Sequence, residues 1–276
     1  MINGKKIIMS DDYGFCFGVK RAIRELKKTK GQAYTLGPVI HNPQVVDYFK
    51  KKGIRPIDRL SKKIKPGKLF IRAHGVSDQK KEQAKKMGFE IFDLTCPFVK
   101  KAQILAKKLE KQGYQVVILG LKNHPETKAI AENLKNPIIL QNHKCSSLNK
   151  NKIGVICQTT SNIKNTKKIL NKIKKTAQEV KIYNTICQAT KKRQKAAHKM
   201  ARQSDIVIVI GGRYSSNTKK LKQVCQEYGP TYHIETEKEL KKKWFKNKKT
   251  IGITAGASTP DWIINKVVKK IKEINS

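Results

Sequence analysis

The sequence predicts an α/β protein made of three similar small units, and three observations support this prediction. Short apolar runs of strand length alternate with lysine-rich amphipathic segments of helix length, a pattern typical of mainly parallel sheets. The 276 residues, of which 38% are hydrophobic, can fill several small cores. Three cysteines recur in one local setting, after a strand and before a helix.

The apolar runs predict ten short strands, each bounded by residues that favour turns. They lie near residues 5–9, 33–36, 68–72, 89–93, 115–119, 137–140, 152–157, 179–183, 205–210 and 249–254. Short strands separated by helices imply several small sheets or one wide sheet.

Cys16, Cys96 and Cys187 occupy the repeated strand-to-helix setting, in GFCFGVKRAI, DLTCPFVKKAQ and NTICQATKKRQ. They are separated by 80 and 91 residues. The second and third cysteines also share a glutamine seven positions later, Gln103 and Gln194. Such a repeat predicts three similar units.

Each cysteine is followed by two polar loops at the ends of strands, where open α/β sheets bind ligands. The offsets from the cysteines are 25 and 58, then 28 and 63, then 28 and 71. The loops carry His41 and His74, then His124, Glu126, Thr159 and Thr160, then Ser215, Ser216, Asn217 and Ser258. A threefold arrangement would bring the three thiolates to a common axis, surrounded by these side chains.

The cysteines also set the expected domain boundaries, because each follows the last strand of a unit. The predicted units are 14–96, 97–187, and 188–276 together with 1–13. The strand at 5–9 would then complete the third unit, and the two ends of the chain would meet there.

Thiolates suit zinc and iron-sulfur clusters. Structural zinc sites use four ligands, whereas a 4Fe-4S cluster with three cysteine ligands keeps one iron open to act as a Lewis acid. Three separated cysteines among six polar loops favour the cluster, with zinc or buried structural cysteines as alternatives. The remaining thiols, Cys145, Cys157 and Cys225, lack the setting and are expected to be structural.

The polar loops contain small donors on glycine-containing turns, which suit phosphate oxygens. Glu126 is their only acid and is placed to deliver protons beside His124. Simpler alternatives stay open: Glu126 as an acid in the first turn of a helix, the Ser-Ser-Asn turn as a helix cap, and each histidine as a turn or core residue.

The 61 Lys and Arg residues against 20 Asp and Glu give a formal charge of +41. Because the lysines recur on almost every predicted helix and turn, we interpret them mainly as a solvated surface that could attract an anionic substrate or an acidic electron-transfer partner. Aromatic residues make up 7% and no RNA-binding signature is visible, so no specific nucleic acid is expected. Without a long apolar stretch or a signal-peptide pattern, the protein is expected to be cytoplasmic, with reduced thiols and no membrane partner.

From about residue 13 to residue 265, the sequence resembles the LytB/IspH family. The motifs that carry the resemblance occur in the family's order: GFCFGVKRAI, IHNP, RAHGVS, DLTCP, NHPE, QTT, NTICQATKKRQ, GGRYSSNTKKL and TAGASTPDWI. Phe17, Lys20 and Asn123 depart from the family's usual residues, but they are neighbours of the expected ligands and not the ligands themselves.

The resemblance implies a trefoil of three α/β domains around a 4Fe-4S cluster held by Cys16, Cys96 and Cys187. It implies reductive dehydroxylation of 4-hydroxy-3-methylbut-2-enyl diphosphate to isopentenyl and dimethylallyl diphosphate, the last step of the non-mevalonate (MEP) isoprenoid pathway. Ferredoxin or flavodoxin would supply the electrons. Two rival interpretations are a three-cysteine cluster hydro-lyase and a basic nucleic-acid-binding protein with a structural metal.

The resemblance also implies a role for each loop residue. Glu126 would donate the proton, Thr159 or Thr160 would hold the hydroxyl group, and His124 would lie between the proton path and the diphosphate. The expected diphosphate ligands are His41, His74, Ser215, Ser216, Asn217 and Ser258.

Overall fold

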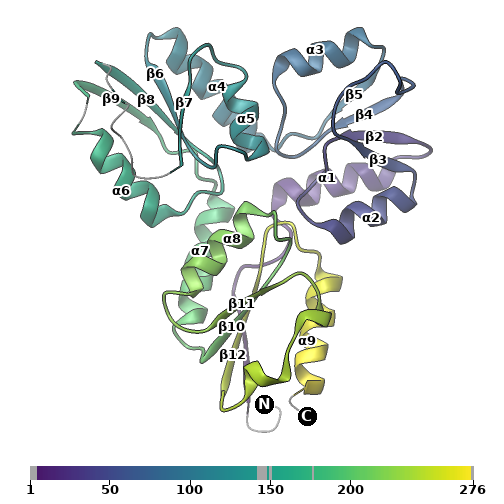
Figure 1. Ribbon diagram of the computed structural model, residues 1–276, viewed down its shortest axis with the longest axis vertical. Coiled ribbons are helices and arrows are strands. Elements are labelled where there is room, and N and C mark those ends of the chain that lie inside the picture. Colours follow the sequence, from purple (N-terminus) through teal and green to yellow (C-terminus); the bar gives the residue numbers. More distant parts are fainter. Residues whose placement is uncertain (1–4, 142–147, 149–150, 176, 275–276) are drawn as a thin grey trace. The chain divides into compact units, whose positions relative to one another are not determined.

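The structure is a computed structural model that describes residues 5–141, 148, 151–175 and 177–274. Within these residues the chain forms three four-stranded sheets, all parallel, with helices on their faces (Figure 1). The α/β class and the three similar sheets predicted from the sequence are therefore confirmed.

The contacts divide the chain into two compact bodies, which are described separately. The terminal body comprises the N-terminal segment through Lys20, His41–Val45, and the chain from Gln188 onward. The central body comprises Arg21–Ile40 and Val46–Cys187, and it contains two of the three sheets. The domain boundaries predicted from the cysteines stay a prediction.

All three sheets have the same strand order. The sheets run β3-β2-β4-β5 and β7-β6-β8-β9 in the central body, and β11-β10-β12-β1 in the terminal body. Their strands are β2 (Ala33–Leu36), β3 (Ile54–Ile57), β4 (Lys68–Ile71), β5 (Glu90–Asp93), β6 (Gln115–Leu119), β7 (Ile138–Leu140), β8 (Lys152–Cys157), β9 (Glu179–Tyr183), β10 (Ile206–Ile210), β11 (Thr231–Ile234), β12 (Thr250–Ala255) and β1 (Lys6–Met9). In each sheet the chain adds its second strand on one side of the first and its third strand on the other. The point where the order reverses, between the first and third strands, is where such sheets bind ligands.

Strand β1 pairs with β12, with Ile7 opposite Ile251 and Ile8 opposite Gly252. The two ends of the chain thus build one sheet, as the sequence predicted. Strands β3 and β11 were not predicted. Both are edge strands of four residues, and β3 contains Pro56, which an edge strand tolerates because one side of its backbone needs no partner.

The helices are amphipathic, and α4 shows why they form. Ala102, Ala106 and Leu109 recur at helical spacing and are fully buried against the sheet of β6 and β8. Leu109 packs on Gly154, where an added Cβ would stand 2.8 Å from its side chain. The described helices are α1 (Phe17–Lys28), α2 (Pro43–Lys51), α3 (Asp78–Lys86), α4 (Pro97–Lys111), α5 (Pro125–Ala131), α6 (Ile163–Ile173), α7 (Gln188–Ala201), α8 (Ser216–Cys225), α9 (Asp261–Ile274) and the short 3-10 turns η1 (Glu237–Glu239) and η2 (Lys242–Phe245).

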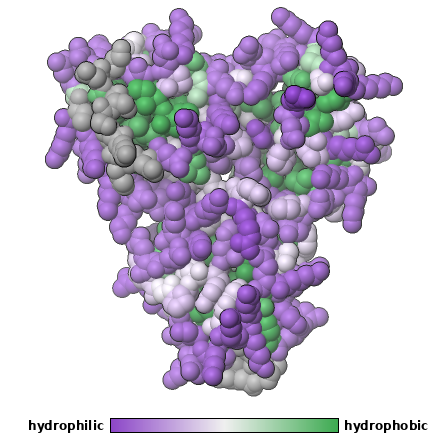
Figure 2. Space-filling model, in the orientation of Figure 1, coloured by the Kyte–Doolittle hydropathy of each residue, from purple (hydrophilic) through white to green (hydrophobic). Residues whose placement is uncertain are grey.

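Hydrophilic side chains cover most of the visible surface (Figure 2). Several lysines pair with carboxylates at the surface, for example Lys85 with Glu82 and Lys270 with Glu273. Exposed pairs of this kind add little stability. In the described part of the chain, no helix combines the length and the apolar character that a bilayer span requires.

Candidate functional site

The three repeated cysteines stand directly before α1, α4 and α7, as predicted. In each repeat the backbone N–H of the cysteine donates to a carbonyl in the loop that follows the third strand. The N···O distances are 3.2 Å from Cys16 to Ala257, 3.0 Å from Cys96 to Ala73 and 3.1 Å from Cys187 to Thr159. Each acceptor is a predicted site residue or its neighbour, so the same bond fixes each thiol beside a loop of the predicted site.

The same three thiols are chemically suited to bind a metal cluster. Cys16, Cys96 and Cys187 are half-buried, are not in disulfides, and lie directly before the first turn of a helix. Cys157 and Cys225 instead lie fully buried in apolar cores, where burial raises the pKa of the Cys225 thiol to about 12. These two are structural, as predicted, and Cys145 lies outside the described residues.

Glu126 lies in the first turn of α5 and is 1% exposed. Its carboxylate accepts two hydrogen bonds from Thr159, one from the backbone N–H (2.6 Å) and one from the hydroxyl group (2.8 Å). Burial raises the pKa of Glu126 to about 7, although the two bonds from Thr159 oppose that shift. Glu126 is thus an acid in the first turn of a helix. Its side chain also accepts hydrogen bonds from Thr159, in the loop after β8, and it can carry a proton near neutral pH.

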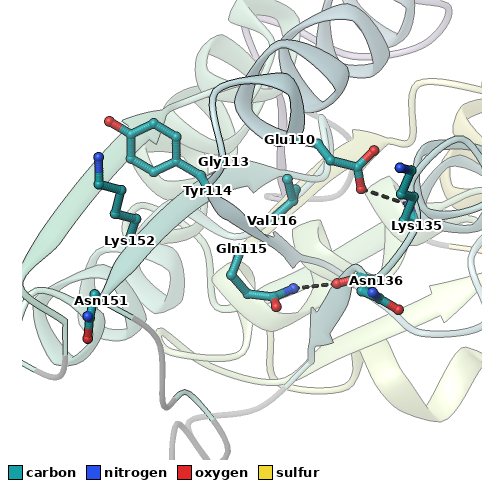
Figure 3. A pocket seen from close by; sticks show the side chains of 9 residues that line it. All are labelled: Glu110, Gly113, Tyr114, Gln115, Val116, Lys135, Asn136, Asn151 and Lys152. Atoms are coloured by element: carbon teal, nitrogen blue, oxygen red, sulfur yellow. Dashed lines mark hydrogen bonds between the residues drawn. The ribbon is translucent and has the colours of Figure 1, made fainter.

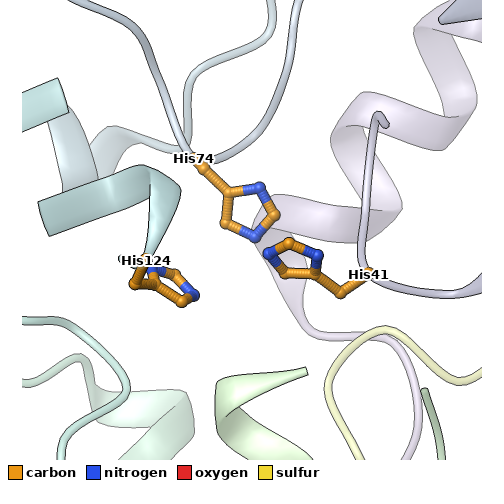
Figure 4. Close-up of side chains that lie close together, drawn as sticks. All are labelled: His41, His74 and His124. Carbon is orange, nitrogen blue, oxygen red and sulfur yellow. The ribbon is translucent and has the colours of Figure 1, made fainter. Parts of the chain in front are cut away.

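His124 is the N-cap of α5, and its Nδ1 accepts a hydrogen bond from the Glu126 N–H at 3.2 Å. The His74 ring stands edge-on to the His124 ring, with centroids 5.4 Å apart and planes at 86° (Figure 4). Two predicted site histidines from different sheets of the central body are therefore neighbours, beside Glu126.

Gln158 lies beside the candidate site residues, and sequence analysis did not single it out. Its Nε2 donates to the Thr160 hydroxyl at 2.9 Å, and its Oε1 accepts from the Leu121 N–H at 3.0 Å. It therefore joins the loop after β6 to the loop after β8. The available signal was its place in the QTT motif, directly after a predicted strand.

In the terminal body, the turn before α8 combines a helix cap with an amide. The Ser215 hydroxyl group accepts from the Thr218 N–H at 3.3 Å, so the capping alternative is correct for Ser215. Ser216 and Asn217 begin the helix and are buried. Asn217 Oδ1 accepts from the Ala257 N–H at 2.9 Å, whereas its Nδ2 is buried without a hydrogen-bond partner. A buried donor at a helix start fits an anionic oxygen.

His41 and Ser258 also meet in the terminal body. The Ser258 hydroxyl group donates to the His41 carbonyl at 3.2 Å. An added Cβ at Gly212 would stand 2.2 Å from that carbonyl oxygen, so the glycine permits the close approach of the His41 backbone. The terminal body thus gathers Cys16, His41, Ser215, Ser216, Asn217 and Ser258, and the central body gathers Cys96, Cys187, His74, His124, Glu126, Thr159 and Thr160.

A pocket of about 690 Å³ lies elsewhere in the central body, at the amino ends of β6 and β8 (Figure 3). Its rim is held by Gln115, which donates to the Asn136 carbonyl, and by Glu110, which accepts from the Lys135 N–H at 2.7 Å. None of the predicted site residues lines it. Since ligands of parallel sheets bind at the carboxyl ends, this pocket is not the candidate site.

The chain matches the family described as LytB protein over residues 7–272. A *Campylobacter hominis* protein named 4-hydroxy-3-methylbut-2-enyl diphosphate reductase is 45% identical over 275 residues, covering 96% of this chain and 98% of that protein. An *Aquifex aeolicus* protein of the same name is 41% identical over 280 residues, covering 97% of this chain and 96% of that protein.

Two solved structures are similar over nearly the whole chain. One is (E)-4-hydroxy-3-methyl-but-2-enyl diphosphate reductase, described as the terminal enzyme of the non-mevalonate pathway; it is 40% identical with a TM-score of 0.69, covering 99% of this chain and 100% of that one. The other is the *Plasmodium falciparum* E-1-hydroxy-2-methyl-but-2-enyl-4-diphosphate reductase, which is 32% identical with a TM-score of 0.90, covering 96% of this chain and 87% of that one. These matches agree with the repeated cysteine setting and the shared strand order, and the chain belongs to the LytB family.

Proposed function

We propose that this protein reduces 4-hydroxy-3-methylbut-2-enyl diphosphate to isopentenyl and dimethylallyl diphosphate, as the last step of the MEP isoprenoid pathway. The substrate takes up two electrons and two protons and loses its hydroxyl group as water. The names of the relatives support the substrate. The observation that carries the proposal is the chain of contacts in which buried Glu126 is held by Thr159, whose carbonyl accepts from the Cys187 N–H.

A 4Fe-4S cluster is the cofactor in this proposal, and Cys16, Cys96 and Cys187 are its proposed ligands. Three half-buried thiols in one repeated setting fit it, because a fourth described thiol in that setting is lacking and the buried Cys157 and Cys225 are enclosed in cores. When bound, a cluster of this kind supplies electrons and an iron without a protein ligand that polarises a substrate oxygen.

Glu126 is the proton donor in this account. With a pKa of about 7, its carboxyl group can hold a proton at neutral pH and give it to the departing hydroxyl group. Thr159 orients the carboxyl group through its two hydrogen bonds, and Thr159 or Thr160 holds the substrate's hydroxyl group. His124 lies between this proton path and the diphosphate.

The diphosphate is bound by small polar groups on the loops where the strand order reverses. Support comes from the buried, unpartnered Nδ2 of Asn217 and from the N-terminus of α8, which favours negative charge. The proposed ligands are His41, His74, Ser215, Ser216, Asn217 and Ser258.

Ferredoxin or flavodoxin is the proposed electron donor, and the cytoplasm is the proposed location because the three thiols must stay reduced. Acidic carriers suit a chain with a formal charge of +41. A groove of about 960 Å³ along α7 supports this choice, since basic side chains dominate its lining. These are Lys192, Lys195, His198, Lys199 and Arg202, with Asp11 paired to Lys199 and Asp12 paired to Arg193.

An anaerobic assay tests the proposal directly. Purified protein with its cluster reconstituted is given the hydroxylated diphosphate with and without a reduced donor, and the products are separated. We expect both five-carbon diphosphates to form only when the donor is present. Loss of water without a donor would support the hydro-lyase instead, and an unchanged substrate with the donor present would contradict the proposal.

A further inference from the structure

A buried glutamine of α4 joins the two sheets of the central body next to the candidate site. Gln103 Nε2 donates to the Val76 carbonyl at 3.3 Å and to the Ala129 carbonyl at 3.4 Å. Val76 lies two residues after His74, and Ala129 lies three residues after Glu126. One side-chain amide thus connects the loop that carries His74 to the helix that carries Glu126.

The chemistry of this contact favours an amide. A primary amide has two N–H donors on one nitrogen and can serve both carbonyls, whereas an apolar side chain of equal length can serve neither. Gly75, between His74 and Val76, has a φ of +75°, and a Cβ added there would stand 3.1 Å from Gln103 Nε2. The turn therefore packs directly on the amide, leaving no room for a larger residue.

The two carbonyls do not depend equally on Gln103. The Ala129 carbonyl also accepts from Asn133 Nδ2 at 2.9 Å, within α5. The Glu126 carboxylate on the same helix is held separately by Thr159. Removing the amide should therefore leave α5 and Glu126 in place and release mainly the loop of His74.

The other contacts between the segment that follows His74 and the end of α5 form a polar, exposed junction. Asn133 Oδ1 accepts from the Asp78 N–H at 2.9 Å, and Lys80 pairs with Glu132 at 2.8 Å. Solvent weakens an exposed ion pair such as that of Lys80. The buried amide of Gln103, at 7% exposure, is the part of the junction that can fix its geometry.

We propose that Gln103 is a positioning residue that holds the His74 loop against α5 and so sets the place of the His74 ring beside His124. This inference rests on the proposed function, in which His74 binds the diphosphate and Glu126 donates the proton. Gln103 then acts on substrate binding and leaves proton delivery unchanged.

The test uses the cluster-loaded protein with Gln103→Met, which keeps an unbranched side chain of similar length and removes both donors. We expect KM to rise about tenfold, because a tenfold change corresponds to the free energy of about one hydrogen bond. The kcat should stay within about threefold of the wild type. The Kd for isopentenyl diphosphate, measured by calorimetry, should rise by the same factor. Lys80→Met, which removes only the exposed ion pair of the same junction, should match the wild type in both measurements.

Gln103→Glu provides a second variant if the methionine protein folds poorly, because it keeps the shape and polarity but cannot donate when ionised. It should show the same split between KM and kcat, with iron content equal to that of the wild type. Unchanged KM and Kd in a folded variant would overturn the inference, as would activity that falls only in proportion to lost iron. A wild-type protein that neither reduces nor binds the diphosphates would instead overturn the proposed function.

Discussion

At the scale of single residues, the central feature is the carboxyl group of Glu126, whose pKa is raised by burial. Two hydrogen bonds from Thr159 favour the charged form of Glu126, but removal from water disfavours it more strongly. The outcome is a pKa of about 7, well above the ordinary 4.5. An acid in this range is matched to proton transfer at neutral pH.

Glu126→Gln tests the role of this proton. The amide preserves the shape of the side chain but has no acidic proton to give, so we expect turnover to fall by about 10² or more. Iron content should stay equal to that of the wild type. Glu90→Gln, an exposed residue at the start of β5, serves as the control and should keep full activity. Normal turnover in the Glu126 variant would show that another group donates the proton.

The raised pKa also predicts how stability depends on pH. The folded protein binds a proton at Glu126 more tightly than the unfolded chain, so the free energy of unfolding should fall as pH rises from about 4.5 to about 7 and stay level above that range. Relative to Glu126→Gln, the wild type should lose about 3 kcal/mol across this window. Denaturant titrations of both apo proteins at several pH values measure the difference. A constant difference would contradict the raised pKa.

The sequence located Glu126 but could not reveal its surroundings. Its place after a strand and beside His124 was visible from spacing. Its pairing with Thr159 depends on β6 and β8 being neighbours in the sheet, which spacing does not specify. Gln158 was missed for the same reason, since its function is to join the loops after those two strands.

At the scale of elements, a glycine in each repeat allows the loop after the first strand to approach the loop after the third strand. Gly37, Gly120 and Gly211 each follow the first strand of a repeat, and each faces side chains from the same repeat. A Cβ at Gly120 would stand 2.8 Å from Thr127 Oγ1 and 2.9 Å from Gln158 Cβ. A side chain at this position would push apart the loops that carry His124 and Thr159.

Gly120→Ala should therefore damage both folding and substrate binding. Overpacking of this kind costs about 1–3 kcal/mol, and we expect a loss of stability in this range together with a raised KM. Gly67→Ala is a matched control, because nothing lies within 4 Å of its added Cβ and its backbone is not left-handed. Thermal melts and steady-state kinetics of the two variants make the comparison. Equal behaviour would mean that the loops can relax without cost.

The central strands were easier to predict from the sequence than two of the edge strands. The central strands β8, β10 and β12 are buried along almost their whole length, and β10 consists only of Ile and Val, so these strands are easy to recognise. The edge strands β3 and β11 have the sequences IRPI and TYHI, in which proline or polar residues interrupt the apolar pattern. They form strands because they pair with β2 and β10, and their own composition does not predict this pairing.

At the scale of the whole molecule, the repeated cysteine setting correctly predicted a threefold internal repeat. The three sheets share one strand order, and in each the cysteine N–H bonds to the loop after the third strand. The sequence indicated the repeat because a thiol, unlike an apolar core residue, is rare enough to mark equivalent positions. No comparable residue pattern predicts the division into two compact bodies, whose boundaries fall within α1 and α2.

The high positive charge predicts a dependence on salt. If an acidic carrier docks on this surface, the rate supported by ferredoxin should fall steeply as ionic strength rises, because salt screens the attraction. The rate with a small viologen donor serves as the control for effects of salt on diphosphate binding. A constant ratio of the two rates across ionic strengths would show that the charge has no part in carrier binding.

The most direct test of the central claim is an anaerobic analysis of iron and sulfide, with visible spectra, for the wild type and Cys96→Ser. Cys157→Ala, which changes a thiol enclosed in a core, serves as the matched control. We expect about four irons per chain and broad visible absorption in the wild type and the control, with both lost in Cys96→Ser. A reconstituted wild type without iron, or a Cys96→Ser protein that keeps the full cluster, would contradict the account.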